Sequence, residues 1–317
     1  MVVYHHGLIS QRGIMKEGKL QQGKASWTAE VSAAYRAAES DRPENERICY
    51  DPISKYFLRT LFQLIGKNPF IRNKFAGIMF WYAERVTPGN PGYVVSRTRC
   101  IDDYLGKCIG EGIEQLVILG AGYDTRAYRF DELKEKVKVF EVDHPATQEL
   151  KVSKVKKLLR TLPDHVVYVA VDFDKEKLQD RMIESGFSNN LKTLFIWEGV
   201  VPYITEEGVD DTLAFASSNS AEGSYIIFDY IFKSVIDGTN QSEVAKRWKK
   251  TLDDLAEPFM FGIEEGNAAE FLTKRGFAEV NEVRVESLRD LYFKGKNKNR
   301  KVFPFAAIVH ATVKLRE

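Results

Sequence analysis

The sequence is poor in cysteine and has no excess of charge of either sign. Its 317 residues include three cysteines, Cys49, Cys100 and Cys108, which cannot all pair and show no CxxC spacing. We therefore expect reduced thiols in a cytoplasmic protein. The 46 basic residues nearly balance the 45 acidic ones, for a net charge of +1. This balance gives no basis for non-specific binding of nucleic acid.

Long hydrophobic runs are also absent. A membrane span needs about 20 consecutive apolar residues, whereas the most apolar run extends from Phe75 to Ala83. The first residues carry charges such as Arg12 and Lys16 and lack the apolar run of a signal peptide. We expect no membrane association. With 44% hydrophobic and 29% charged residues, the composition is typical of a globular protein with a sizeable core.

After residue 110, short runs of β-branched and aromatic residues alternate with amphipathic segments that have charged faces. The predicted strands are Gln115–Leu119, Val137–Val142, Val166–Val171, Thr193–Trp197 and Ser224–Phe228. The predicted helices between them are Thr147–Leu159, Lys175–Ser185 and Glu206–Ser217. This alternation indicates βαβ units and a parallel sheet that is covered on both faces.

The two ends of the chain differ from this middle. Asn267–Lys274 is predicted to be a helix, followed by strands at Val280–Val285 and Phe303–Leu315 with only a polar connection between them. Such strands should pair antiparallel, as a C-terminal hairpin. The basic run Lys294–Lys301 would then be a solvated loop. Before residue 110, helices are predicted at Trp27–Glu39, Pro52–Ile65, Phe70–Arg85 and from Asn90-Pro91 to Gly112, with Asn90 as the N-cap.

The strongest local signal is a glycine turn between a strand and a helix. Gly120 and Gly122 follow the strand ending at Leu119, and glycine lets the backbone approach a ligand closely. Asp143 ends the next strand, about 20 residues further on, where a carboxylate can accept hydrogen bonds from ribose hydroxyls. Thr125 stands where a dinucleotide site has its third glycine. A nucleoside without phosphates, such as S-adenosylmethionine, therefore fits better than NAD.

Two further strands end in acidic residues. Asp172 can accept the exocyclic amine of adenine, with Phe173 against the base, and Glu198 can attract the ammonium group of an amino-acid moiety. A single acid at a strand end is usually a solvated cap. Because three successive strands carry one, a functional role is favoured.

Arg97 supplies a cation next to this predicted site. It lies on the flank of the apolar stripe of the helix that begins near Pro91. From there it can bind the carboxylate of a cofactor bidentately. It can equally pair with Asp124 or Glu198, and the sequence leaves both interpretations open.

These residues carry a family resemblance that covers the chain from about Thr28 to the C-terminus. The segments Ser96–Arg99, Val117–Arg126, Phe140–Asp143, Val171–Phe173 and Glu198–Tyr203 resemble the leucine carboxyl methyltransferase family. The resemblance is closest to the bacterial and archaeal branch, which includes polyketide carboxyl methyltransferases of the tetracenomycin type. It implies a Rossmann-like class I methyltransferase fold, with a seven-stranded, mostly parallel sheet.

The resemblance also assigns roles to single residues. It implies that S-adenosylmethionine is contacted by one group of side chains and turn residues: Arg97, Gly120, Asp143, Asp172, Phe173 and Glu198. It places Tyr203 beside the transferred methyl group and Arg126 at the family's arginine after the glycine turn, where we expect contact with the acceptor.

The chemistry favours a carboxylate as the methyl acceptor. The sulfonium of the cofactor activates its own methyl group, so we expect no metal. A carboxylate, with a pKa of about 4, is ionised at neutral pH and needs no general base. A phenol would need one, and the family pattern supplies no obvious His or Lys. We expect O-methylation of a small organic acid, with a protein C-terminus as the alternative acceptor.

Acceptor recognition should lie outside the sheet. We expect residues 1–90 to form a helical N-terminal extension or lid on a cofactor-binding domain of residues 91–317, with an insertion at 230–263. Both regions are rich in large apolar side chains, which either line an acceptor pocket or pack between helices: Trp27, Tyr35, Phe75, Met79, Phe80, Trp81 and Tyr82, and Phe232, Trp248, Phe259, Met260 and Phe261.

Arg36 is the candidate for attracting an acidic acceptor. Two functions of other classes also remain, a nicotinamide-dependent oxidoreductase and a non-catalytic nucleoside-binding protein. The missing third glycine argues against the oxidoreductase.

Overall fold

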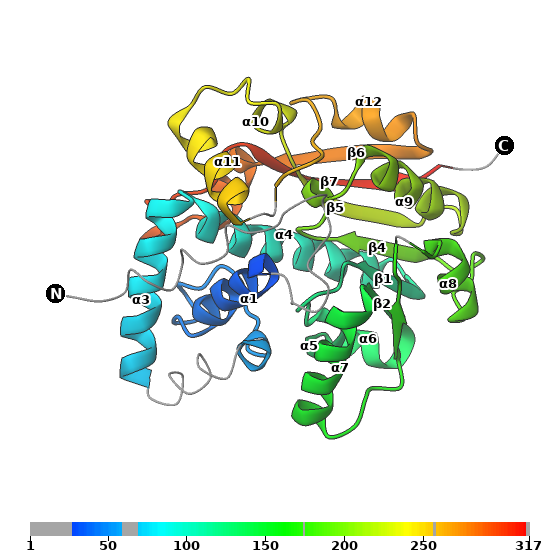
Figure 1. The fold of residues 1–317 in the computed structure, drawn as a ribbon. Coiled ribbons are helices and arrows are strands. Elements are labelled where there is room, and N and C mark those ends of the chain that lie inside the picture. Colours follow the sequence, from blue (N-terminus) through cyan, green and yellow to red (C-terminus); the bar gives the residue numbers. More distant parts are fainter. Residues whose placement is uncertain (1–26, 59–68, 174, 256–257, 315–317) are drawn as a thin grey trace.

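A computed structural model describes residues 27–58, 69–173, 175–255 and 258–314 of the chain. Seven strands form one sheet in the order β3-β2-β1-β4-β5-β7-β6 (Figure 1). Strands β1 to β5 pair in parallel, and β7 runs antiparallel to both β5 and β6. The predicted fold class is confirmed. The strands are β1 (Gln115–Leu119), β2 (Lys138–Asp143), β3 (Val166–Ala170), β4 (Thr193–Trp197), β5 (Tyr225–Ile231), β6 (Phe277–Arg284) and β7 (Ala306–Val313).

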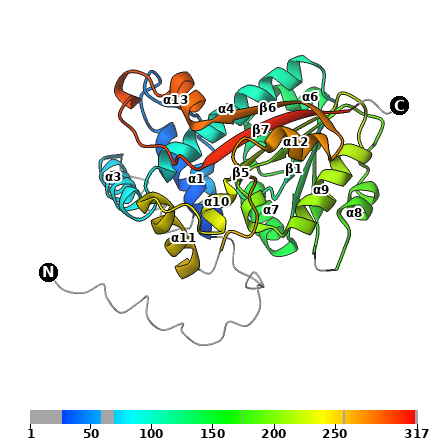
Figure 2. The same cartoon turned by 90° about the horizontal axis from the view of Figure 1, so that it is seen from above.

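Helices cover both faces of the sheet because the strand residues that point to either face are apolar. In β1, Leu116 and Ile118 belong to one buried cluster, and Val117 and Leu119 belong to another. The first cluster includes residues of α4 (Asn90–Gly110), α6 (Asp131–Lys136), α7 (Pro145–Leu159) and α13 (Val285–Tyr292). The second includes residues of α8 (Leu178–Glu184), α9 (Glu206–Ser218) and α12 (Ala268–Thr273) (Figure 2).

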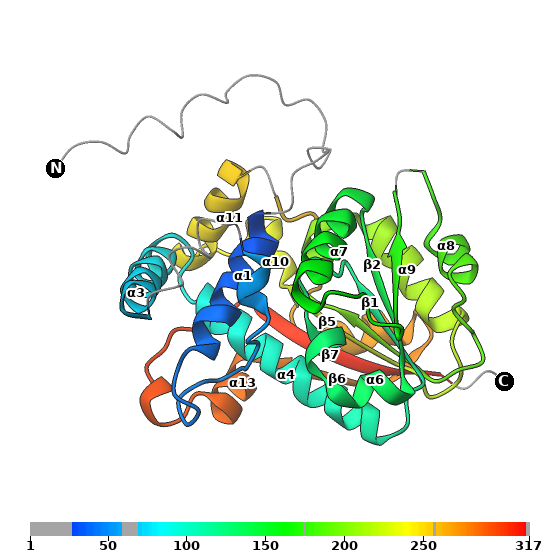
Figure 3. The ribbon, with the colours of Figure 1, turned by 90° about the horizontal axis from the view of Figure 1, so that it is seen from below.

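The N-terminal helices gather with the insertion after β5 at one end of the molecule, away from α8 (Figure 3). α1 (Trp27–Ser40) packs on α4 and on the short 3-10 turn η1 (Ser54–Phe57), and α3 (Pro69–Val86) packs on α4 and on α11 (Glu243–Leu255). The insertion also holds α10 (Lys233–Ile236). The predicted helix Pro52–Ile65 is described as far as Leu58, and the rest of it lies outside the described residues.

Two boundaries differ from the sequence prediction. The connection between β6 and β7 is not merely polar, because it contains the helix α13, whose Leu288 is buried in the core next to α4. The N-cap of α4 is Gly89 rather than Asn90. Gly89 has a φ of +81°, and an added Cβ would lie 2.5 Å from the backbone nitrogen of Phe303. Close backbone contact therefore requires glycine at this cap.

The lysines of the basic run after α13 are exposed, as expected of a solvated loop, but Arg300, Lys296 and Asn297 also attach this loop to the N-terminal part of the chain. Arg300 forms an ion pair at 2.8 Å with Glu39 of α1, a carboxylate that is 1% exposed. Lys296 pairs with Glu46 at 2.5 Å, and Asn297 of the 3-10 turn η3 (Gly295–Asn297) is buried. The C-terminal connection therefore holds the N-terminal extension in place.

The three cysteines are unpaired, as the composition predicts. Cys49, Cys100 and Cys108 are free, buried thiols. Within the part of the chain that the structure describes, no helix combines the length and the apolar character that crossing a bilayer demands.

Candidate active site

The glycine turn after β1 brings three of the predicted residues together. Gly120 and Gly122 have φ angles of +62° and +40°, and a Cβ on Gly120 would lie 2.5 Å from Cγ2 of Val200. Asp143, the last residue of β2, accepts hydrogen bonds from the amides of Gly122 and His144. Desolvation raises the pKa of Asp143, although these two amides act in the opposite direction.

Glu198, which follows β4, lies between two arginines. Its Oε1 accepts hydrogen bonds from Arg97 Nε at 3.0 Å and from Thr98 Oγ1 at 3.1 Å, and its Oε2 lies 2.7 Å from Arg126 Nη1. Burial alone would raise the pKa of Glu198, but Arg126 and Arg97 outweigh burial and hold this pKa well below its usual range. Glu198 is therefore a carboxylate anion that joins the two cations.

Arg97 binds a second carboxylate that the sequence analysis missed. Its Nη1 donates to Asp229 Oδ2 at 2.7 Å, and Asp229 Oδ1 accepts the amide of Gly199 at 2.6 Å. The pairing of Arg97 with Glu198 is thus one of the alternatives that the sequence left open, and Asp124 pairs with Arg126 instead.

A signal for Asp229 was present in the sequence. It is the single charged residue of β5, a strand that is otherwise apolar or aromatic, and it is 1% exposed. A carboxylate in such a strand needs a cation, because an unpaired buried charge is very unfavourable. The search for that cation could have led from Asp229 to Arg97.

Arg126 is the first residue of the short helix α5 (Arg126–Arg129), which follows the glycine turn, and it is 2% exposed. Its guanidinium pairs with Asp102 at 2.8 Å, with Asp124 and with Glu198, and its Nη2 donates to the carbonyl of Thr98 at 3.4 Å. These contacts account for its burial. The predicted contact with an acceptor stays a prediction.

Arg36, the other predicted acceptor contact, is also buried. In α1 it donates Nε to Asp51 Oδ2 at 2.9 Å and Nη2 to the carbonyl oxygen of Tyr123 at 2.6 Å. Tyr123 directly follows Gly122, so Arg36 contacts the glycine turn. Its predicted role towards an acceptor is likewise untested.

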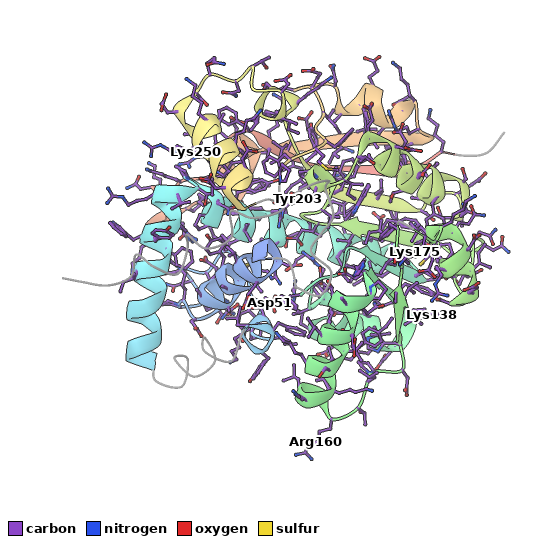
Figure 4. All side chains as sticks on the ribbon, in the orientation of Figure 1. Asp51, Lys138, Arg160, Lys175, Tyr203 and Lys250 are labelled. Atoms are coloured by element: carbon purple, nitrogen blue, oxygen red, sulfur yellow. The ribbon has the colours of Figure 1, made fainter. Side chains whose placement is uncertain are left out.

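Asp172 and Phe173 lie after β3, the outermost strand of the parallel part of the sheet. Asp172 pairs with Lys175 at 2.6 Å, and its amide donates to Glu176 at 2.9 Å. The Phe173 side chain is 58% exposed, which leaves its ring accessible to a ligand. Lys175 marks this region in Figure 4, away from Tyr203 near the middle of the molecule.

A cavity of about 180 Å³ adjoins Arg97 and Asp229. Tyr203, in the 3-10 turn η2 (Val201–Tyr203), packs on Phe259 with ring centroids 5.4 Å apart, and Trp248 stacks on Phe259 at 6.2 Å. The lining combines aromatic and aliphatic side chains with polar groups of the site: Val31, Tyr35, Tyr82, Val86, Tyr93, Val94, Arg97, Gly199, Tyr203, Asp229, Ile231, Trp248 and Phe259.

Four of the predicted acceptor-pocket residues, Tyr35, Tyr82, Trp248 and Phe259, line this cavity. Three of the other predicted aromatic side chains lie elsewhere. Phe232 and Phe261 belong to the buried core, and Trp81 is 59% exposed. The side chains of Trp27, Phe75 and Met79 lie outside the described part of the chain.

Comparisons with known proteins identify the family of this chain and support its fold. A family model described as leucine carboxyl methyltransferase matches residues 29–217. The protein YktD of Bacillus subtilis (strain 168), provisionally named an S-adenosyl-L-methionine-dependent methyltransferase, is 29% identical over 308 residues, which cover 93% of this chain and 100% of YktD. A Mycobacterium marinum protein with the same provisional description is 30% identical over 235 residues, 67% of this chain and 74% of its own.

A solved structure supports the fold alone. The crystal structure of a provisionally named methyltransferase from Thermobifida fusca superimposes with a TM-score of 0.55 and 13% sequence identity, and the match covers 90% of this chain and 95% of that one.

Proposed function

The chain belongs to the leucine carboxyl methyltransferase family and uses S-adenosylmethionine, and from this premise we propose that it methylates a carboxylate of a small, polyketide-like organic acid. The observation that carries the proposal is the cavity in which Arg97 and Tyr203 meet the rings of Trp248 and Phe259. Flat apolar walls with a few polar groups suit a small molecule with an aromatic body.

In this proposal the cofactor lies along the carboxyl ends of β1 to β4. Asp143 accepts hydrogen bonds from the ribose, and Gly120 and Gly122 allow close approach of the backbone. Arg97 uses Nη2, the nitrogen not engaged by Glu198 or Asp229, for the carboxylate of the cofactor.

Two further contacts complete the proposed cofactor site. Glu198 supplies negative charge for the ammonium group while it holds Arg97 in place. Asp172 and Phe173 take the adenine.

The reaction then depends on alignment. The sulfonium of the bound cofactor supplies an activated methyl group. An ionised carboxylate at neutral pH attacks without a base, so the protein has to bring the oxygen into line and exclude water. The Tyr203 hydroxyl orients the acceptor oxygen, and the surrounding rings of the cavity keep water out.

We include in the proposal the division of the chain into an N-terminal extension of residues 1–90 and a cofactor-binding domain of residues 91–317. Its support is that α1 and α3 contribute Tyr35 and Tyr82 to the wall of the cavity, and that the insertion at 230–263 contributes Trp248 and Phe259. The buried free thiols are consistent with a cytoplasmic protein, which we include in the proposal.

The test uses S-adenosylmethionine labelled in its methyl group, incubated with a panel of aromatic and aliphatic carboxylic acids and, separately, with a cell lysate. We expect base-labile label in small molecules. Label that enters protein instead would support C-terminal carboxyl methylation and contradict the small-molecule acceptor.

Tyr203→Phe tests the role of the hydroxyl in the same assay. It should lower turnover of the acid found above by about 10-fold or more, because an orienting hydrogen bond is lost. The affinity for S-adenosylmethionine, measured by calorimetry, should change little. A loss confined to cofactor affinity would place Tyr203 outside the acceptor site.

A further inference from the structure

Two buried cations from different helices bind carbonyl oxygens of the glycine turn. Arg36 of α1 donates to the carbonyl of Tyr123 at 2.6 Å, and Lys151 of α7 donates to the carbonyl of Ala121 at 3.2 Å. Arg36 is 8% exposed and Lys151 is 1% exposed. The two carbonyls belong to the residues on either side of Gly122.

Each cation is held by its own buried carboxylate. Arg36 pairs with Asp51 at 2.9 Å, and Lys151 pairs with Glu141 at 2.9 Å. Asp51 is 1% exposed and Glu141 is fully buried. Because buried ion pairs often stabilise a fold no better than apolar pairs of the same size, two of them at one turn suggest a purpose other than stability.

The two carbonyls belong to one chain of hydrogen bonds that ends at Asp143. The carbonyl of Tyr123 and the amide of Asp124 form one planar peptide group, and that amide donates to the carbonyl of Ala121 at 2.7 Å. The carbonyl of Ala121 and the amide of Gly122 form another, and that amide donates to Asp143.

A contact that orients either carbonyl therefore also orients the amide of Gly122, which binds Asp143, because each peptide group is planar. The chain runs from Arg36 through two peptide groups to the carboxylate, and Lys151 joins it at the carbonyl of Ala121. Each hydrogen bond in such a chain polarises the next. Gly122, whose backbone is the least restricted of any residue type, is the link that most needs to be fixed.

We propose that Arg36 and Lys151 are positioning residues for S-adenosylmethionine, which hold the glycine turn so that Gly122 and Asp143 are arranged for the ribose before the cofactor binds. The inference rests on the cofactor placement given under the proposed function. It assigns Arg36 to the cofactor rather than to an acidic acceptor, and it makes α1 part of the cofactor site.

The test compares paired substitutions that remove both charges of one ion pair. Arg36→Met with Asp51→Asn, and Lys151→Met with Glu141→Gln, remove the donor to the turn without leaving a buried charge unpaired. The matched control is Arg300→Met with Glu39→Gln, because that ion pair also joins a cation to a buried carboxylate and includes a residue of α1 but does not contact the turn.

The readouts are the dissociation constants of S-adenosylmethionine and S-adenosylhomocysteine by calorimetry, and the midpoint of urea unfolding without ligand. We expect each turn variant to bind both ligands about 10-fold more weakly than the control variant does, even where the two have lost the same stability. Equal affinity in all three variants, or an affinity that follows the unfolding midpoint alone, would overturn the proposal.

A milder variant decides the matter if a paired variant fails to fold. Arg36→Lys keeps the charge next to Asp51 but lacks the fork that reaches both partners. It should weaken cofactor binding about 3-fold or more while the unfolding midpoint is retained; unchanged binding contradicts the inference.

Two further measurements separate this inference from the proposed function. Cofactor binding is measured without an acceptor. If the turn variants lose cofactor affinity as expected but the wild type methylates no acid, only the proposed acceptor is contradicted. Asp143→Ala in the same series tests the ribose contact on which the inference depends. Unchanged affinity for S-adenosylmethionine would contradict that contact and the inference with it.

Discussion

Glu198→Gln tests whether one carboxylate holds the site together. Glutamine keeps the shape of the side chain and removes its charge, so the contacts to Arg97 and Arg126 lose their ionic character. Removing one partner of a buried ion pair typically costs about 3–5 kcal/mol when it leaves a charge uncompensated. Here Arg97 keeps Asp229, and Arg126 keeps two carboxylates.

The expected loss is therefore smaller than for an orphaned charge. Two weakened charge-assisted hydrogen bonds correspond to about 2–3 kcal/mol of the free energy of unfolding. Urea unfolding at pH 7, followed by circular dichroism, measures it. Asp229→Asn is the matched comparison, because it removes the other carboxylate of Arg97 while Glu198 remains.

The pH dependence gives a second check of Glu198. Because the pKa of Glu198 is lower in the folded protein than in the unfolded chain, its contribution to stability is complete above its unfolded value of about 4.3. The contribution is lost as the pH falls from there towards the folded pKa. The difference between wild type and Glu198→Gln should shrink below about pH 4.

Two results would refute the role of Glu198 as a link between the arginines. One is a loss of less than about 1 kcal/mol, the size of an ordinary exposed ion pair. The other is a free energy of unfolding that stays the same while the affinity for S-adenosylmethionine falls. The second result would mean that Glu198 serves the cofactor alone.

Three other variants test the turn, the ribose contact and the sheet. Asp143→Ala should weaken binding of S-adenosylmethionine by about 1–3 kcal/mol in calorimetry, and unchanged affinity would place the ribose elsewhere. Gly120→Ala should cost about 1–2 kcal/mol for the left-handed backbone plus about 1–3 kcal/mol for the contact with Val200. Val200→Ala in the same chain should recover only the second part in thermal unfolding. Burial next to Lys107 lowers the pKa of His310 to about 4, so stability should fall as the pH drops from about 6.5 towards 4. Urea unfolding at pH 7 and pH 5 should show a smaller difference for His310→Gln than for wild type.

The central strands could be predicted closely from the sequence, because local composition determines them. Gln115–Leu119 and Thr193–Trp197 match β1 and β4 residue for residue, since both strands are apolar on both faces. The helix α13 could not be recognised in the same way. It is eight residues long, its N-cap Arg284 makes no side-chain capping bond, and its burial depends on α4, which lies far away in the sequence.

The sequence predicts the placement of those candidate residues that lie at strand ends. Asp143 and Glu198 end or follow strands of a parallel sheet, so the topology brings them to one edge. Asp229 lies inside β5, where a search of strand ends does not find it. The contact between Arg36 and Tyr123 joins residues 87 positions apart, and no local pattern predicts such a contact.

The ion pair between Glu39 and Arg300 sets an order of events during synthesis. These residues are 261 positions apart, so the first described helix leaves the ribosome long before its closest cation exists. Domains fold as units while their N-terminal parts emerge first, yet Glu39 would have to give up its hydration for a weaker contact with Arg42 at 3.7 Å. We infer that α1 docks late, after the connection before β7 has been made. A nascent chain that ends before residue 300 would therefore lack the ion pair that ties α1 to the C-terminal connection.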